Sequence, residues 1–355
     1  MDMRTTAKTE RPKAPVRNTV AVKDRSKRVI ESARKIRAPF TLDESLCIYS
    51  PQDNVDSLKH PRIADWIRYV TEDYDPKLPK KGLRILLMMP CTKTKPYPFS
   101  SEHKSINQRL LDEGFKPVAR DYLPQELQAQ LESGYSQEVL NLSPMVNASG
   151  TVIHKAVISE PMAYVPYENI TTYQGKPSPA TAYDDPGLFE KRGNAVSPWR
   201  TDSTATPVGA TRWKWGPEEL RHYVIMHNAM AETLASVLKR IGHLYTDRIA
   251  WVAPGLTHRS FVLARDERAA NKIVASRKVG NQRLDLTGAN DLLPPELRIE
   301  CLPTIPHCQD AIKRLAKRLG TDPSRVGGTY SRGGTDATPL ALPELLDVLV
   351  QRIKQ

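Results

Sequence analysis

Five chemically reactive side chains lie close together between residues 91 and 103. They are a thiol, an amine, a phenol, a hydroxyl and an imidazole, carried by Cys91, Lys95, Tyr97, Ser100 and His103. A lysine near a cysteine can lower the pKa of the thiol, and a histidine can act as its base. The segment therefore favours a nucleophilic Cys91. The alternative is that Cys91 is a small apolar residue at the end of a strand, with Lys95 and His103 in solvent.

This segment follows the strongest strand signal in the chain. Residues 83–90 form a continuous apolar run that stops at a proline, which is typical of a strand buried on both faces. The same reasoning predicts three more strands and five helices. The strands lie over 151–161, 248–254 and 297–303, and the helices over 105–114, 123–133, 216–244, 308–319 and 343–353. Strands that alternate with helices predict an α/β fold with a mainly parallel sheet.

Sheets of this kind bind ligands beyond the carboxyl ends of their strands. That rule directs attention to Cys91 after the first strand, and to His258 and Arg259 after the third. We expect His258 and Arg259 to contact a phosphate or a base; the alternative is a solvated loop. The four cysteines include no CxxC pair and no histidine spacing supports a metal site, so we predict neither a metal nor a cofactor.

The loop also has a recognisable spacing. It resembles the signature of the archaeosine synthase family, whose seven fixed positions are filled here by Pro90, Cys91, Lys95, Pro96, Tyr97, Ser100 and His103. Segments 158–168 and 182–184, and the start of a helix at Trp215, resemble the family in the same order. The resemblance covers residues 80–265. The family's Ser/Thr-Ser-Pro step reads Ser159-Glu160-Pro161 here, and its transglycosylase-like and PUA domains have no counterpart.

The resemblance implies an unusual reaction on nucleic acid. The family adds the amine of lysine to the nitrile of 7-cyano-7-deazaguanine in tRNA, and a radical SAM partner then cleaves the amidine-type adduct to archaeosine. For this chain we expect tRNA or DNA bearing that base, lysine or another amine donor, and as further partners a radical SAM enzyme and a transglycosylase. The implied fold is a three-layer α/β/α sandwich similar to uracil-DNA glycosylases, which agrees with the order of predicted elements.

A mechanism follows as a hypothesis. Cys91 would add to the nitrile and give a thioimidate, which the amine then displaces. Lys95 or His103 would lower the pKa of the thiol or donate a proton, while Tyr97 and Ser100 would position the base or stabilise charge. The remaining expected substrate-binding residues are Ser159 and Tyr183, with Asp184 and Glu219 as ligands for the cationic amine.

Charge and composition separate a basic N-terminal arm from the rest of the chain. It has 52 basic and 40 acidic residues, a net charge of +12, which points to a polyanionic partner. Residues 1–38 hold twelve basic and four acidic residues and read as a disordered arm that binds nucleic acid or is simply solvated, apart from a short helix over 24–37. We expect a helical lead-in over 39–80, the catalytic module over 81–280 and an α/β extension over 281–355.

Two other function classes remain open at this point. One is a non-catalytic module that delivers modified nucleic acid to a partner, and the other is a DNA glycosylase on the same fold. A glycosylase needs an acidic residue or Asn that activates water after the first strand, and this segment offers Cys91 and Lys95 instead. No apolar run is long enough to span a bilayer and no apolar leader begins the sequence, so we expect no membrane partner and a cytoplasmic location.

Overall fold

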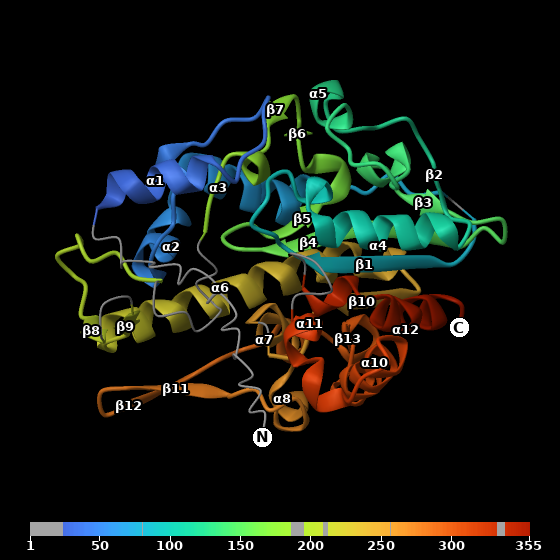
Figure 1. The fold of residues 1–355 in the computed structure, drawn as a ribbon. Helices are drawn as coiled ribbons and strands as arrows, with labels where there is room; N and C mark the ends of the chain where they lie inside the picture. Colours follow the sequence, from blue (N-terminus) through green and yellow to red (C-terminus); the bar gives the residue numbers. More distant parts are fainter. Residues whose placement is uncertain (1–23, 80, 186–194, 209–211, 256, 332–337) are drawn as a thin grey trace, which may run out of the picture.

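The computed structural model describes residues 24–79, 81–185, 195–208, 212–255, 257–331 and 338–355. A seven-stranded sheet lies at their centre (Figure 1). Its main path runs β13-β10-β1-β4-β3-β2, and β5 pairs with β4. The bounds are β1 Arg84–Pro90, β2 Lys116–Pro117, β3 Met145–Val146, β4 Val152–Ser159, β5 Ala163–Pro166, β10 Asp247–Trp251 and β13 Glu300–Leu302.

Four neighbouring strands of the sheet, β13, β10, β1 and β4, are parallel. The short strands β3 and β5 pair antiparallel with β4, and β2 pairs antiparallel with β3. The predicted α/β class is confirmed, with a mixed sheet whose strands are mostly parallel. From Ile85 onward β1 is buried throughout, and so is all of β4. Burial on both faces is what the apolar runs of these two strands predict.

Four long helices pack around the sheet, and all were predicted. They are α4 Ser101–Asp112, α6 Pro217–Ile241, α10 Ile305–Arg318 and α12 Pro343–Ile353. The longest, α6, begins with a proline, whose missing N–H has no partner to lose in the first turn. Acidic residues stand in its first turn and basic residues in its last, as the helix dipole favours.

The helix predicted over 123–133 is mostly absent. Only one turn forms, α5 Gln125–Gln128, and Leu127 is its one buried residue. A helix in a protein is stabilised mainly by packing of its apolar face, because the first turn is costly to form. One buried side chain provides too little packing for a longer helix. Two short hairpins lie between β5 and α6, namely β6 Thr172–Tyr173 with β7 Lys176–Pro177 and β8 Thr206–Val208 with β9 Arg212–Lys214.

Shorter elements complete the fold. The helices are α1 Arg25–Ala33, α2 Pro51–Ser57, α3 Pro61–Arg68, α7 Thr257–Val262, α8 Arg265–Ala270, α9 Ala289–Leu292 and α11 Gly327–Ser331. A further hairpin, β11 Ser276–Val279 with β12 Gln282–Asp285, extends away from the body of the molecule in Figure 1. Within the described ranges, none of the helices has both the length and the apolarity needed to cross a membrane.

Both ends of the described chain join the central fold. The second half of the predicted 1–38 arm forms α1, and Ser32 on this helix is buried and hydrogen-bonded to Asp184. The short helix that the sequence predicts over 24–37 is thus present as α1, whereas residues 1–23 of the predicted arm lie outside the described residues. At the other end β13 extends the sheet, and the predicted boundary between 280 and 281 falls in the turn of the β11–β12 hairpin.

Candidate active site

Three carboxyl-terminal ends of neighbouring strands meet at one edge of the sheet. Parallel register aligns Pro90 of β1 with Ile158 of β4 and Met88 with Ala250 of β10. The strand order β10-β1-β4 therefore brings the residues after β1, β4 and β10 to the same edge. The backbone N–H of Cys91 continues the pairing and donates to the Ile158 carbonyl at 3.0 Å. The sequence-based expectation that chemistry lies at this edge has a structural basis.

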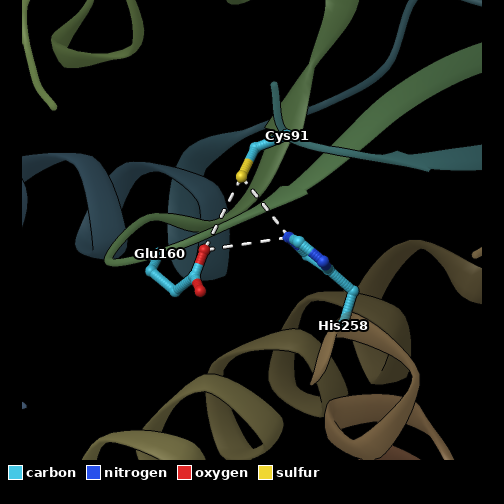
Figure 2. Close-up of side chains that lie close together, drawn as sticks. All are labelled: Cys91, Glu160 and His258. Atoms are coloured by element: carbon cyan, nitrogen blue, oxygen red, sulfur yellow. Dashed lines mark hydrogen bonds and ion pairs between the residues drawn. The ribbon is translucent and has the colours of Figure 1, made fainter. Parts of the chain in front are cut away.

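Cys91, Glu160 and His258 form a compact cluster at that edge, called here the Cys91 cluster. Figure 2 shows their side chains pointing toward one another, from the end of β1, from the turn after β4 and from α7. The Sγ of Cys91 lies 3.4 Å from Nε2 of His258 and 3.6 Å from Oε2 of Glu160. The same Nε2 and Oε2 atoms are 3.8 Å apart. Cys91 is the least buried of the three residues.

Burial and nearby charge set the protonation of this cluster. Burial raises the pKa of the Cys91 thiol to about 12; the Asp185 carboxylate also raises it, while the Lys95 charge lowers it. The pKa of Glu160 is raised well above its ordinary value by burial and then by Asp185. Without a bound cation or proton acceptor, the thiol and the carboxyl group of the Cys91 cluster therefore stay protonated at neutral pH.

A second group of predicted residues holds the loop beside the Cys91 cluster. The hydroxyls of Tyr97, Ser159 and Tyr183 form a closed triangle with edges of 3.0, 2.8 and 2.5 Å. Lys95 is buried, and its Nζ lies 4.5 Å from the centre of the Tyr183 ring and donates to the Thr92 carbonyl. The structure thus brings four predicted residues together, and they fix the loop that carries Cys91.

His103 does not reach Cys91, which corrects its predicted role as the base. Its Nε2 is 2.9 Å from the Pro90 carbonyl and its Nδ1 is 2.6 Å from the Tyr167 hydroxyl. Burial lowers the pKa of His103 to about 4, so the ring is neutral and donates one bond while accepting the other. Ser100 is the N-cap of α4 and accepts from the His103 backbone N–H at 3.2 Å. Both are positioning residues.

Three residues that the sequence predicts as substrate ligands already have hydrogen bonds or ion pairs to other residues of the protein. The Asp184 Oδ2 accepts from Ser32 Oγ at 2.6 Å and pairs with Lys35 Nζ at 2.5 Å. A lysine of the chain itself thus takes the place expected for the amine of the substrate.

Glu219 closes the capping box of α6. It accepts hydrogen bonds from Gln52, Ser203, Thr204 and Gly216. Arg259 is fully buried and donates to the Pro303 carbonyl at 2.7 Å and to Asn271 Oδ1 at 3.1 Å. The geometry gives neither residue a role as a substrate ligand.

Sequence reasoning missed Glu160 as a functional residue, and Asp185 with it. Glu160 follows β4 directly, so the rule about carboxyl ends that selected Cys91 and His258 also applies to it. It also stands at the position where the resembled pattern has a serine. Asp185 gave no comparable signal, because only the tertiary structure brings its charge near Cys91.

The described residues also line a cavity that does not include the Cys91 cluster. A cavity of about 840 Å³ is lined by residues from 39–43, 61–65 and 173–182. It includes none of the predicted site residues. The donor atoms of that cluster could hold a metal ion, since all three lie within 4.8 Å of one another.

Searches against protein-family models, curated proteins and solved structures found no match.

Proposed function

We propose that this protein adds an amine, from lysine or another donor, to the nitrile of 7-cyano-7-deazaguanine in tRNA or DNA. One observation carries the proposal. The thiol of Cys91, in a loop that resembles the archaeosine synthase signature, lies at the carboxyl edge of the sheet, 3.4 Å from the imidazole of His258. A nucleophile within reach of a base is the arrangement that covalent addition to a weak electrophile requires.

The reaction balances without an oxidant or reductant. The sulfur of Cys91 forms a bond to the nitrile carbon, and the thiol proton passes by way of His258 to the nitrile nitrogen, which gives a thioimidate. The amine nitrogen then bonds to the same carbon, the carbon–sulfur bond breaks, and a proton of the amine returns to the thiol. Glu160, whose raised pKa keeps it protonated, can donate a hydrogen bond to the nitrile nitrogen.

The rest of the proposal comes from the resemblance. We propose that the module over 81–280 has the three-layer arrangement of uracil-DNA glycosylases, which act on bases in nucleic acid. A transglycosylase would install the nitrile-bearing base, and a radical SAM enzyme would cleave the adduct. We place the reaction in the cytoplasm, where thiols such as Cys91 stay reduced.

The test is an adduct assay with the purified full chain. Nitrile-bearing tRNA and DNA are each incubated with isotope-labelled lysine, and the digested nucleosides are identified by mass spectrometry. We expect a labelled amidine with the wild type and a loss of at least about 10³-fold with Cys91→Ala. Cys308→Ala is the matched control, because Cys308 is also a partly buried free cysteine but lies on α10.

Other outcomes of the same assay separate the alternative functions. Undiminished adduct formation with Cys91→Ala would remove the nucleophile and leave a loop that only holds the substrate. Tight binding of nitrile-bearing nucleic acid without any product would identify a delivery module. Release of the free base would identify a glycosylase.

A further inference from the structure

We propose that Cys91, Glu160 and His258 form a binding site for a single zinc ion with one open coordination position. The three donor atoms face a common point in Figure 2 and come from three different elements, the ends of β1 and β4 and helix α7. Neither the cysteine spacing nor the histidine spacing predicts such a site, because the ligands are 69 and 167 residues apart in the chain.

The distances between the donor atoms fit a tetrahedral ion. Zinc binds sulfur at about 2.3 Å and nitrogen or carboxylate oxygen at about 2.0–2.2 Å, which separates tetrahedral ligand atoms by roughly 3.4–3.6 Å. In the Cys91 cluster the sulfur–nitrogen, sulfur–oxygen and nitrogen–oxygen distances are 3.4, 3.6 and 3.8 Å. Small movements of flexible side chains would be enough for all three atoms to bind one ion.

The arrangement differs from a nucleophile–histidine–acid triad. In a triad the acid binds the ring nitrogen that faces away from the nucleophile. Here both the thiol and the Glu160 carboxyl group face Nε2 of His258. The other nitrogen, Nδ1, is buried and has no hydrogen-bond partner among the described residues. Three donor atoms that converge on one point are the arrangement that a metal ion requires.

The donor set selects the kind of metal. A thiolate and an imidazole suit zinc, whereas magnesium and calcium prefer oxygen ligands. A thiolate and a carboxylate also balance the two charges of the ion, which offsets the cost of burying them unpaired. Three protein ligands with a fourth position for water or substrate are the pattern of catalytic rather than structural zinc sites.

The role of the ion rests on the proposed function, although its binding does not. With the ion bound, His258 and a deprotonated Glu160 would be its ligands, and this would replace the proton transfer through His258 and the hydrogen bond from Glu160 described for the metal-free cluster. A coordinated thiol is deprotonated outright, so the metal would hold Cys91 as the thiolate that attacks the nitrile carbon. The open position would accept the nitrile nitrogen and stabilise the negative charge that develops on it. The thiol proton leaves when the metal binds, and the amine supplies the proton that the nitrogen finally carries.

The experiment measures metal binding by the full chain in the absence of nucleic acid. Protein stripped with a chelator is loaded with Zn²⁺, dialysed and analysed by inductively coupled plasma mass spectrometry, and a second sample is loaded with Co²⁺. We expect about one Zn²⁺ per chain, and with Co²⁺ the tetrahedral spectrum and a thiolate charge-transfer band. We expect Cys91→Ser, Glu160→Gln and His258→Gln each to lower zinc affinity more than about 100-fold, beyond the usual cost of losing an outer-shell partner.

Matched controls and the Co²⁺ spectrum keep the test decisive. Cys308→Ser and His222→Gln, which lie on α10 and α6 outside the cluster, should retain the ion. Zinc retained by the three ligand variants, or no thiolate band in wild-type protein loaded with Co²⁺, would overturn the site even if a variant fails to fold. Adduct formation by a chain that binds no zinc would refute the zinc site alone, and zinc binding without adduct would refute only the proposed function.

Discussion

Two buried histidines of this protein have opposite surroundings. His103 belongs to a group that we call the Tyr167 cluster, with Tyr167 and Lys155, and both of its ring nitrogens have close partners. His258, in the Cys91 cluster, has one nitrogen facing a thiol and a carboxyl group and the other without a partner among the described residues. Buried polar groups with all their hydrogen bonds made stabilise a fold. Polar groups that lack a partner, at the carboxyl edge of a sheet, are candidates for binding or catalysis.

The largest expected effect is on the Cys91 cluster. His258→Gln should lower the rate of adduct formation by about 10²–10⁴-fold, since it removes the imidazole that lies 3.4 Å from the thiol. The melting temperature should change little. His222→Gln is the control, because His222 lies on α6 and its Nδ1 bonds to the Glu218 carbonyl. Equal rates in both variants would show that His258 takes no part in the reaction.

The next effect is on stability in the Tyr167 cluster. His103→Ala should lower the free energy of unfolding by about 2–4 kcal/mol, because it removes two buried hydrogen bonds, one to the Pro90 carbonyl and one to the Tyr167 hydroxyl. Urea denaturation measures the change, with His222→Ala as the surface control. If stability were unchanged while adduct formation was lost, His103 would belong to the chemistry and the contrast with His258 would disappear.

A smaller effect depends on pH and also concerns the Tyr167 cluster. Burial lowers the pKa of Lys155 from 10.5 to about 7, so between these values the unfolded chain binds a proton that the folded chain lacks. The wild-type stability should therefore rise with pH across this window, by about 2 kcal/mol from pH 7 to pH 9 through this group. Lys155→Met should remove that part of the slope, as urea denaturation at several pH values can measure. Identical slopes in the two proteins would show that Lys155 is charged in the folded state.

The smallest effect concerns neither cluster. Residues 1–23 contain six basic and two acidic residues, so deleting them should weaken nucleic-acid binding and reduce its salt dependence without changing the two clusters. Deletion of residues 1–38 should also destabilise the protein, because it removes the bonds of Ser32 and Lys35 to Asp184. Binding titrations at several salt concentrations test this. An unchanged salt slope after removal of residues 1–23 would place the binding charge in the folded part.

The sequence predicted the position of the candidate site better than it predicted the role of each residue in it. It placed Cys91 and His258 at strand ends, because apolar runs reveal strands and parallel strands align their carboxyl ends. It treated Ser100, His103 and Glu219 as chemical groups, although caps and buried hydrogen bonds occupy them. Spacing along the chain shows which element carries a residue, but not which polar partner its side chain finds.

The sequence by itself determined the α/β class, the order of the main strands and helices, and the edge of the sheet where Cys91 lies. These features follow from local patterns, namely apolar runs, prolines and helix-end residues. Only the tertiary structure decided that Glu160 and His258, rather than Lys95 and His103, meet the thiol. The reason is physical. The three donors converge because strand order and register place distant segments side by side, and no periodicity within one segment records that pairing.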